Sequence, residues 1–233
     1  MNNELPIVCI PGLLFTPRLY AEQLPSLWRF GPITVAQHGL QESVEAIARS
    51  ILASAPERFA LVGLSMGGYV SFEILRQAPE RVAKLALLDT TARPDSPEKT
   101  ADRRALIGRA RSVPIREISD ELFPRLVDRS RRQDESLRNL FRQMAEETGV
   151  EGFIRQQTAI VKRPDSRPGL KEIRCPTLVL VGEGDELTPP ELAAEIADGV
   201  AGARLVKVPG CGHASTLEQP QAVTRALVEW LEG

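Results

Sequence analysis

A serine in a glycine-rich pentapeptide is the residue best suited to chemistry in this sequence. Gly63, Ser65 and Gly67 form the pattern G-x-S-x-G between an apolar run of strand length, residues 59–62, and a run of apolar residues at helical spacing. Glycines suit such a turn because the backbone on either side of the serine approaches closely and leaves no room for a Cβ atom. The turn would expose the Ser65 hydroxyl at the strand end, where the helix start offers N–H groups to a developing anion. The alternative is an ordinary tight turn.

Serine is a poor nucleophile at neutral pH and needs a base and an orienting carboxylate. The sequence has two histidines, His38 and His213, and His213 stands in a glycine-bracketed loop after a predicted strand. Asp185 lies in a short loop between another predicted strand and a helix start. We therefore predict a catalytic triad of Ser65 as nucleophile, His213 as general base and acid, and Asp185 as orienting carboxylate.

Other assignments of the base and the acid stay open from the sequence. Glu183 or Asp89 could supply the carboxylate, since each also follows a predicted strand, and Asp185 would then be a turn or N-cap residue. His213 could be a structural histidine. His38 could be a second site residue or an ordinary loop residue.

Six short apolar runs predict the strands that position these residues. The runs are 7–10, 33–36, 59–62, 82–88, 177–181 and 204–208. They alternate with segments of helical periodicity and are apolar nearly throughout, which indicates an α/β fold with a parallel sheet covered on both faces. Functional residues in such sheets gather at the C-terminal strand ends. Gly12, His38, Ser65 and Asp89 all follow such ends.

The residue pattern changes between residues 91 and 170, where clear strand patterns are absent and charged residues are frequent. The apolar residues keep helical spacing, so we predict a helical cap over residues 91–170, inserted into an α/β core of residues 1–90 and 171–233. Most of its charges are expected on a solvated face. Some of its arginines could instead point toward an anionic substrate.

Three local features predict packing and helix starts. A buried helix face near the N-terminus is predicted from Leu19, Leu24, Leu27 and Trp28. Trp230 is predicted to be a core residue of the terminal helix. Thr188 and Glu191 have the spacing of a capping box before a helix.

The sequence resembles the α/β-hydrolase superfamily, in its cap-bearing group of small bacterial serine esterases and related hydrolases. The stretches that match, in chain order, are IPGLL, GLSMGGY, LVGEGDELTPP and VPGCGHASTLEQP. The resemblance implies a mostly parallel sheet of about six strands, because the first two family strands are missing, with flanking helices and a helical cap. Pro11 stands where the family loop commonly has histidine, which removes a side chain but no backbone donor.

The family pattern also implies roles for loop residues. The backbone N–H groups of Leu13 and Met66 would stabilise the oxyanion formed during acyl transfer. Apart from the resemblance, we predict that Leu14, Phe15 and His38 line the substrate pocket beneath the cap.

Composition excludes several classes of function. The 233 residues carry a formal net charge of −2, which gives no reason to expect a nucleic acid or an anionic membrane as partner. No apolar run is long enough to span a bilayer, and the start of the sequence lacks the pattern of a signal peptide. No metal-ligand spacing or cofactor-phosphate loop is found, so neither a metal nor a cofactor is expected.

Cysteine usage favours a reducing compartment. Cys9, Cys175 and Cys211 cannot all pair, and their spacing matches neither a zinc site nor a redox pair. We therefore predict a cytoplasmic protein. Cys211 as an alternative nucleophile has no feature of an activated thiol around it.

The predicted function is a serine hydrolase that cleaves a small, mainly apolar ester through an acyl-enzyme. The same residues could act on a thioester, a lactone or a carbon–carbon bond next to a ketone, because a fold does not choose among these substrates. A hypothesis of another class is a ligand-binding, receptor-type protein that turns over slowly.

Overall fold

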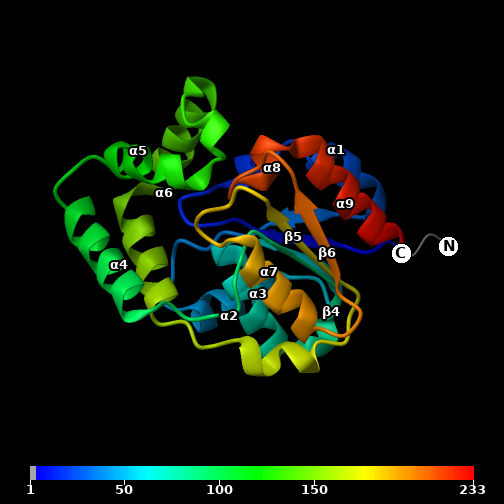
Figure 1. The fold of residues 1–233 in the computed structure, drawn as a ribbon. Coiled ribbons are helices and arrows are strands. Elements are labelled where there is room, and N and C mark those ends of the chain that lie inside the picture. The colour runs from blue at the N-terminus through cyan, green and yellow to red at the C-terminus, as the bar shows by residue number, and fades with distance from the viewer. Residues whose placement is uncertain (1–3) are drawn as a thin grey trace.

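A computed structural model describes residues 4–233, which form one six-stranded sheet in the order β2-β1-β3-β4-β5-β6 (Figure 1). Every neighbouring pair of strands is parallel. The strands are β1 (Ile7–Ile10), β2 (Ile33–Val35), β3 (Phe59–Leu64), β4 (Val82–Leu88), β5 (Thr177–Gly182) and β6 (Arg204–Val208). The predicted fold class, a parallel sheet of about six strands flanked by helices, is therefore confirmed.

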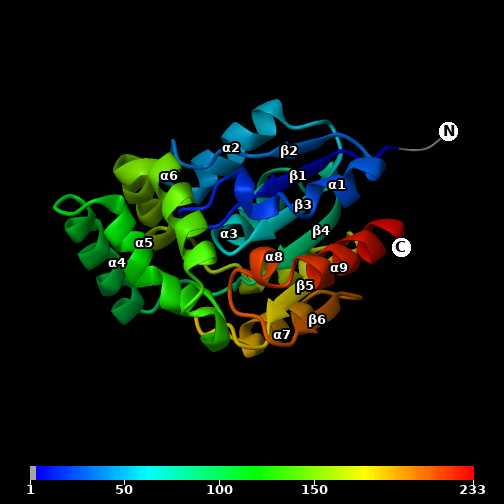
Figure 2. The ribbon, with the colours of Figure 1, turned by 90° about the horizontal axis from the view of Figure 1, so that it is seen from above.

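Helices cover both faces of the sheet, which is why the central strands are apolar throughout (Figures 1 and 2). One face packs against α2 (Val44–Ser54), α3 (Met66–Gln77) and α7 (Pro190–Gly199). The other packs against α1 (Leu24–Leu27), α9 (Pro220–Glu232) and the short helix η1 (Pro17–Tyr20), and α8 (Ser215–Glu218) adjoins α9. Alternate residues of β1 divide between the two cores, with Ile7 and Cys9 in one and Val8 and Ile10 in the other.

Three helices interrupt the sheet pattern between β4 and β5. They are α4 (Pro97–Ala110), α5 (Ile115–Leu126) and α6 (Glu135–Val161), and we call residues 91–170 the insertion. They have an apolar cluster of their own, which includes Ile118 and Phe153 and also Leu14 from the loop after β1. Helix α6 breaks at Gly149, whose φ of 71° and ψ of 168° are not helical. The insertion therefore packs on the C-terminal end of β1 through a bent helix.

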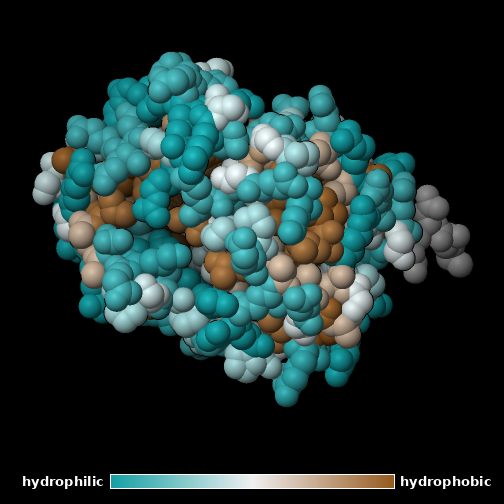
Figure 3. Space-filling model, in the orientation of Figure 1, coloured by the Kyte–Doolittle hydropathy of each residue, from teal (hydrophilic) through white to brown (hydrophobic). Residues whose placement is uncertain are grey.

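Short 3₁₀ helices connect several elements. They are η2 (Trp28–Phe30), η3 (Pro79–Arg81), η4 (Arg129–Arg131) and η5 (Arg167–Glu172). Figure 3 shows a mostly hydrophilic face of the molecule, with patches of hydrophobic residues near the insertion and over β6.

The predicted buried helix near the N-terminus is wrong at Trp28. Leu19 and Leu27 are buried and Leu24 packs partly against them, but the Trp28 side chain is 71% exposed. The segment breaks into η1, α1 and η2 instead of one continuous helix, so the helical periodicity does not carry Trp28 onto the buried face. Trp230 is buried, and its indole N–H donates to the carbonyl of Pro176 at 3.2 Å.

The two tryptophans give a matched test of this packing. Replacing Trp230 by Ala should lower the free energy of unfolding by about 3–5 kcal/mol, because it leaves a cavity in the core. Replacing Trp28 by Ala should change it by less than about 0.5 kcal/mol, as is usual for an exposed side chain. Urea unfolding followed by circular dichroism measures both, and equal losses would contradict the burial difference.

Candidate active site

Ser65 occupies a strained turn between β3 and α3. Its φ of 55° and ψ of −113° lie outside the regions that ordinary residues adopt, and its N–H donates to the carbonyl of Leu88 at 2.9 Å. A Cβ atom on Gly67 would lie 2.0 Å from the carbonyl oxygen of Ile10. A Cβ on Gly63 would lie 2.5 Å from the carbonyl oxygen of Gly67. Both glycines are therefore required by close backbone contacts, as the sequence pattern indicates.

Ser65, His213 and Asp185 are joined by two successive hydrogen bonds, although they are far apart in the chain. The Ser65 hydroxyl donates to Nε2 of His213 at 2.8 Å, and Nδ1–H of His213 donates to Oδ2 of Asp185 at 2.8 Å. All three side chains are buried. This geometry can move the serine proton to the imidazole while the carboxylate stabilises the charge that results.

The Asp185 carboxylate is held in its ionised form by several donors. Oδ1 accepts from the backbone N–H groups of Leu187 and Thr188 at 2.8 and 2.9 Å, and Oδ2 accepts from the Thr188 hydroxyl at 2.7 Å. Burial raises the pKa of Asp185, but the positive charge of His213 and these hydrogen bonds outweigh it and leave the pKa below its usual value.

The predicted capping box is wrong, because the Thr188 hydroxyl donates a hydrogen bond to Asp185 and does not cap the helix. Helix α7 begins at Pro190 with Pro189 as its N-cap, and no side chain caps it. Sequence reasoning missed this role because a threonine three residues before a glutamate has the same local signature in either case.

The His213 imidazole is tuned by opposing effects. Burial lowers its pKa, but the charge of Asp185 and its hydrogen bond raise it more, so the net pKa lies above the usual value of 6.5. The protonated form, which must exist transiently when the imidazole takes the serine proton, is therefore stabilised.

The alternative acids and the alternative nucleophile occupy other environments. The Asp89 carboxylate accepts from the N–H of Gly182 at 2.9 Å and from the Ser215 hydroxyl, with no hydrogen bond to His213. The Glu183 residue is exposed to solvent. Burial raises the pKa of the Cys211 thiol far above its usual value, the opposite of an activated nucleophile.

The two predicted oxyanion donors belong to segments that adjoin Ser65. Met66 directly follows the serine at the start of α3, and Leu13 follows Gly12 in the loop after β1. Neither N–H donates to an acceptor within residues 4–233. A Cβ on Gly12 would lie 3.3 Å from Cβ of Ser65, so this loop passes directly over the nucleophile.

Residues 7–226 match the sequence profile of the alpha/beta hydrolase family. The chain belongs to the alpha/beta hydrolase family. The predicted resemblance is confirmed, and with it the assignment to a family of hydrolytic enzymes.

The comparisons also relate this alpha/beta hydrolase to individual proteins. A 2-hydroxy-6-oxononadienedioate/2-hydroxy-6-oxononatrienedioate hydrolase of Paraburkholderia phymatum is 29% identical over 75% of this chain and 62% of its own length. A thermophilic esterase from Thermogutta terrifontis, solved with malate bound, has a TM-score of 0.87 and 32% identity over 98% of this chain and 89% of its own. An enol-lactonase from Burkholderia xenovorans has a TM-score of 0.89 and 26% identity over 99% of this chain and 92% of its own.

The three predicted pocket residues of the alpha/beta hydrolase lie in different surroundings. Phe15 and His38 line a cavity of about 380 Å³ between the insertion and the loop after β2. Leu14 does not line this cavity, because its side chain packs with Ile118 and Phe153 of the insertion. His38 is buried, and its Nε2 lies 3.0 Å from the carbonyl oxygen of Gly12.

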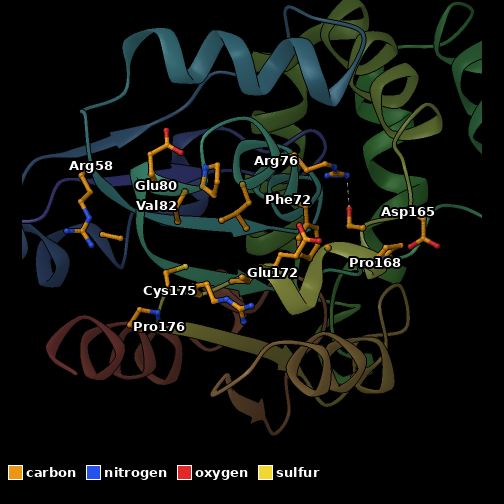
Figure 4. A pocket seen from close by; sticks show the side chains of 17 residues that line it. Arg58, Phe72, Arg76, Glu80, Val82, Asp165, Pro168, Glu172, Cys175 and Pro176 are labelled. Atoms are coloured by element: carbon orange, nitrogen blue, oxygen red, sulfur yellow. Dashed lines mark hydrogen bonds between the residues drawn. The ribbon is translucent and has the colours of Figure 1, made fainter.

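A second cavity, of about 950 Å³ (Figure 4), lies at the N-terminal ends of β4 and β5, whereas Ser65 and Asp185 follow the C-terminal ends of β3 and β5. It is bounded by Phe72 of α3, by Val82 at the start of β4 and by Cys175 just before β5. None of the predicted site residues lines it.

Glu218 is a buried carboxylate of this site that sequence reasoning missed. Its two oxygens accept from the N–H of Gly212 at 3.0 Å and from the N–H of Asp128 at 2.7 Å, so it joins the His213 loop to the insertion. Burial raises the pKa of Glu218 to about 7. Glu218 stands within the VPGCGHASTLEQP stretch, but no residue pattern indicates that its partner is a backbone in the insertion.

The described part of the chain offers no metal site and no membrane helix. Residues 4–233 contain no group of three or more His, Cys, Asp or Glu side chains arranged to hold a metal ion. None of the helices in the same residues is both long enough and apolar enough to cross a bilayer. Cys9, Cys175 and Cys211 are free thiols.

The raised pKa of His213 predicts a pH profile. Because the base acts when neutral, kcat/KM should rise with pH through the His213 pKa, which Asp185 holds above 6.5. Asp185→Asn should lower kcat on the order of 10⁴-fold and move this acidic limb to lower pH, since the imidazolium loses its partner. The measurement is ester hydrolysis from pH 4 to 9. The exposed Asp198 is the control, because Asp198→Asn should keep the wild-type profile; an unmoved limb in Asp185→Asn would contradict the assignment.

The raised pKa of Glu218 predicts a pH dependence of stability. Between the usual value of 4.5 and about 7 the folded state holds a proton that the unfolded state releases, so stability falls as pH rises through this window. The total loss should be about 3 kcal/mol. Glu218→Gln removes this titration, so its unfolding free energy should fall less than that of the wild type between pH 5 and 8. Urea unfolding measures the slopes, with the exposed Glu80→Gln as control; equal wild-type and Glu218→Gln slopes would refute the prediction.

Proposed function

We propose that this alpha/beta hydrolase cleaves a small, mainly apolar carboxylic ester through an acyl-enzyme on Ser65. The observation that carries the proposal is the pair of hydrogen bonds that link the Ser65 hydroxyl to His213 and His213 to Asp185, each 2.8 Å long. Two similar solved structures, an esterase and an enol-lactonase, hydrolyse bonds of this chemical class by their names.

The proposed mechanism uses only groups of this chain and water. The Ser65 oxygen attacks the ester carbonyl carbon as its proton passes to Nε2 of His213, and Asp185 stabilises the imidazolium. The negative carbonyl oxygen is bound by the N–H groups of Leu13 and Met66. The tetrahedral intermediate collapses, and His213 returns the proton to the leaving alcohol. A water molecule then attacks the acyl group with His213 as base, which releases the acid and restores Ser65.

We propose that the insertion, residues 91–170, acts as a cap that adds an apolar contact close to Ser65. Ser65 is only 7% exposed, and Phe15 next to it packs edge to face on Phe141 of α6 with ring centroids 5.1 Å apart. The least exposed arginine of the insertion is already paired, since Arg163 donates to Asp95 at 2.8 Å. Arg155, which lines the cavity with Phe15 and His38, likewise has a partner, since its Nε donates to the carbonyl of Gly39 at 2.8 Å. These pairings favour a neutral substrate over an anionic one.

A lactone is the second candidate substrate, favoured by the similarity to an enol-lactonase over nearly the whole chain. Thioester and carbon–carbon bond hydrolysis use the same residue roles. Slow-turnover ligand binding is the alternative from another class. A cytoplasmic location, and action on a small molecule with no nucleic acid or membrane partner, remain predictions from the sequence.

Turnover of a substrate panel tests the proposal. Wild-type protein should hydrolyse short-chain p-nitrophenyl esters repeatedly, and Ser65→Ala should lower kcat by on the order of 10⁴- to 10⁶-fold because the nucleophile is lost. A fluorophosphonate probe should label the wild type and the Ser26→Ala control, in which an exposed serine is removed, but not Ser65→Ala. Equal rates for wild type and Ser65→Ala would exclude the serine mechanism. Faster turnover of lactones or acyl-CoA thioesters would reassign the bond, and tight binding without turnover would favour the receptor-type alternative.

A further inference from the structure

The loop that carries Leu13 is a strained turn. The N–H of Phe15 donates back to the carbonyl of Gly12 at 3.1 Å, which closes the turn, and Leu14 has a positive φ of 62°. A positive φ is unfavourable for a bulky residue such as leucine, so the turn is stable only where contacts with surrounding residues stabilise it. The Leu13 N–H, the proposed oxyanion donor, therefore depends on groups outside the loop for its direction.

His38 holds the peptide group to which the Leu13 N–H belongs. Its Nε2 lies 3.0 Å from the Gly12 carbonyl oxygen, and that carbonyl and the Leu13 N–H are the two ends of one peptide unit. Because a trans peptide is planar, with its C=O and N–H pointing in opposite directions, a donor on the oxygen fixes where the N–H points. Burial lowers the pKa of His38 to about 4, so the ring is neutral near pH 7, and its one proton lies on Nε2 where it donates to Gly12.

Gln156 of α6 holds the next peptide group. Its Oε1 accepts from the N–H of Leu14 at 3.0 Å, and this contact joins residues 142 positions apart in the chain. The side chains of Gln156 and His38 are both buried, and their Nε2 atoms lie 3.3 Å apart. The peptide groups on both sides of Leu13 are thus each fixed by a buried side chain.

Helix α6 reaches this loop through more than one contact. Nε of Arg155 donates to the carbonyl of Gly39 at 2.8 Å, which ties α6 to the loop that carries His38. Phe141, on the other side of the break at Gly149, packs against Phe15. The insertion therefore contacts the Gly12–Phe15 turn at Leu14 and Phe15, and it is also tied to the loop whose His38 contacts Gly12.

We propose that Gln156 and His38 are positioning residues that aim the Leu13 N–H at the reacting carbonyl oxygen, so that the insertion completes the oxyanion hole. The inference rests on the proposed function. It assigns to α6 a role in stabilising the transition state, beyond covering the pocket. Neither side chain needs to touch the substrate.

Variants that remove one polar contact each test this proposal. Gln156→Met and His38→Leu should each lower kcat for a p-nitrophenyl ester by roughly 10- to 100-fold, which does not exceed the decrease in kcat typical of removing one oxyanion donor. KM should change by no more than about twofold. The affinity for an arylboronic acid, which forms a tetrahedral adduct on Ser65, should fall by a similar factor. Gln156→Glu keeps an acceptor and His38→Gln keeps a donor, so both should recover most of kcat.

Gln157→Met is the matched control for structural damage. Gln157 is the neighbouring residue of α6, equally buried, and its Oε1 accepts from Arg103 at 2.9 Å, away from the loop. This variant should lower the melting temperature without the loss of kcat or of boronic-acid affinity. A Gln157→Met enzyme as impaired as Gln156→Met would overturn the positioning role.

The outcomes separate this inference from the proposed function. Wild type that neither turns over esters nor reacts with the fluorophosphonate would refute the serine mechanism and the inference together. An active wild type with unchanged kcat in folded Gln156→Met and His38→Leu would refute the inference alone. If one of these two variants fails to fold, the other decides, because each acts on a different peptide group of the same turn.

Discussion

The close approach of two backbones beside Ser65 is the constraint on which the site depends. Gly67 lies so near the Ile10 carbonyl that no side chain fits between them. This contact brings the end of β1 against the start of α3, and so places the loop after β1 over the serine. A similar contact joins the other half of the site, since a Cβ on Gly182 at the end of β5 would lie 2.1 Å from the carbonyl oxygen of Gly212, beside His213. Close backbone packing therefore positions the side chains of Ser65 and His213.

Three buried carboxylates surround His213, and their hydrogen bonds divide them by role. Asp185 receives the imidazole N–H, and its pKa lies below the usual value. Asp89 and Glu218 accept from backbone or hydroxyl donors instead, and burial raises the pKa of both. The His213 charge lowers the pKa of both Asp185 and Asp89, but it outweighs desolvation only at Asp185, which also has hydrogen bonds to His213 and Thr188. Proximity alone would therefore not identify the acid. The negative charges of the other two still raise the pKa of the imidazole.

The insertion braces the candidate site on two sides. The end of α5 and the segment after it meet the His213 loop, where the N–H of Ala214 donates to the carbonyl of Leu126 at 3.0 Å and Glu218 accepts from the N–H of Asp128. Its helix α6 meets the loop after β1 through Gln156. The His213 loop and the loop after β1 are thus both tied to one inserted unit, which gives a structural route by which changes in the insertion reach the proposed chemistry.

The sequence by itself determined the six strands and the close turn at Ser65, because apolar runs and required glycines are local signals. It predicted Ser65, Asp185 and His213 as triad residues, but only the tertiary structure decided that they are hydrogen-bonded to one another. Only the tertiary structure decided that Asp89 binds other donors and that Glu183 is exposed. Trp28 and the capping box at Thr188 were mistaken, because a helix break and a competing carboxylate override local periodicity. Gln156 could not be found from sequence, since a buried glutamine in a helix has no distinguishing pattern. Its partner lies 142 residues away, and such a contact exists only once the chain has folded.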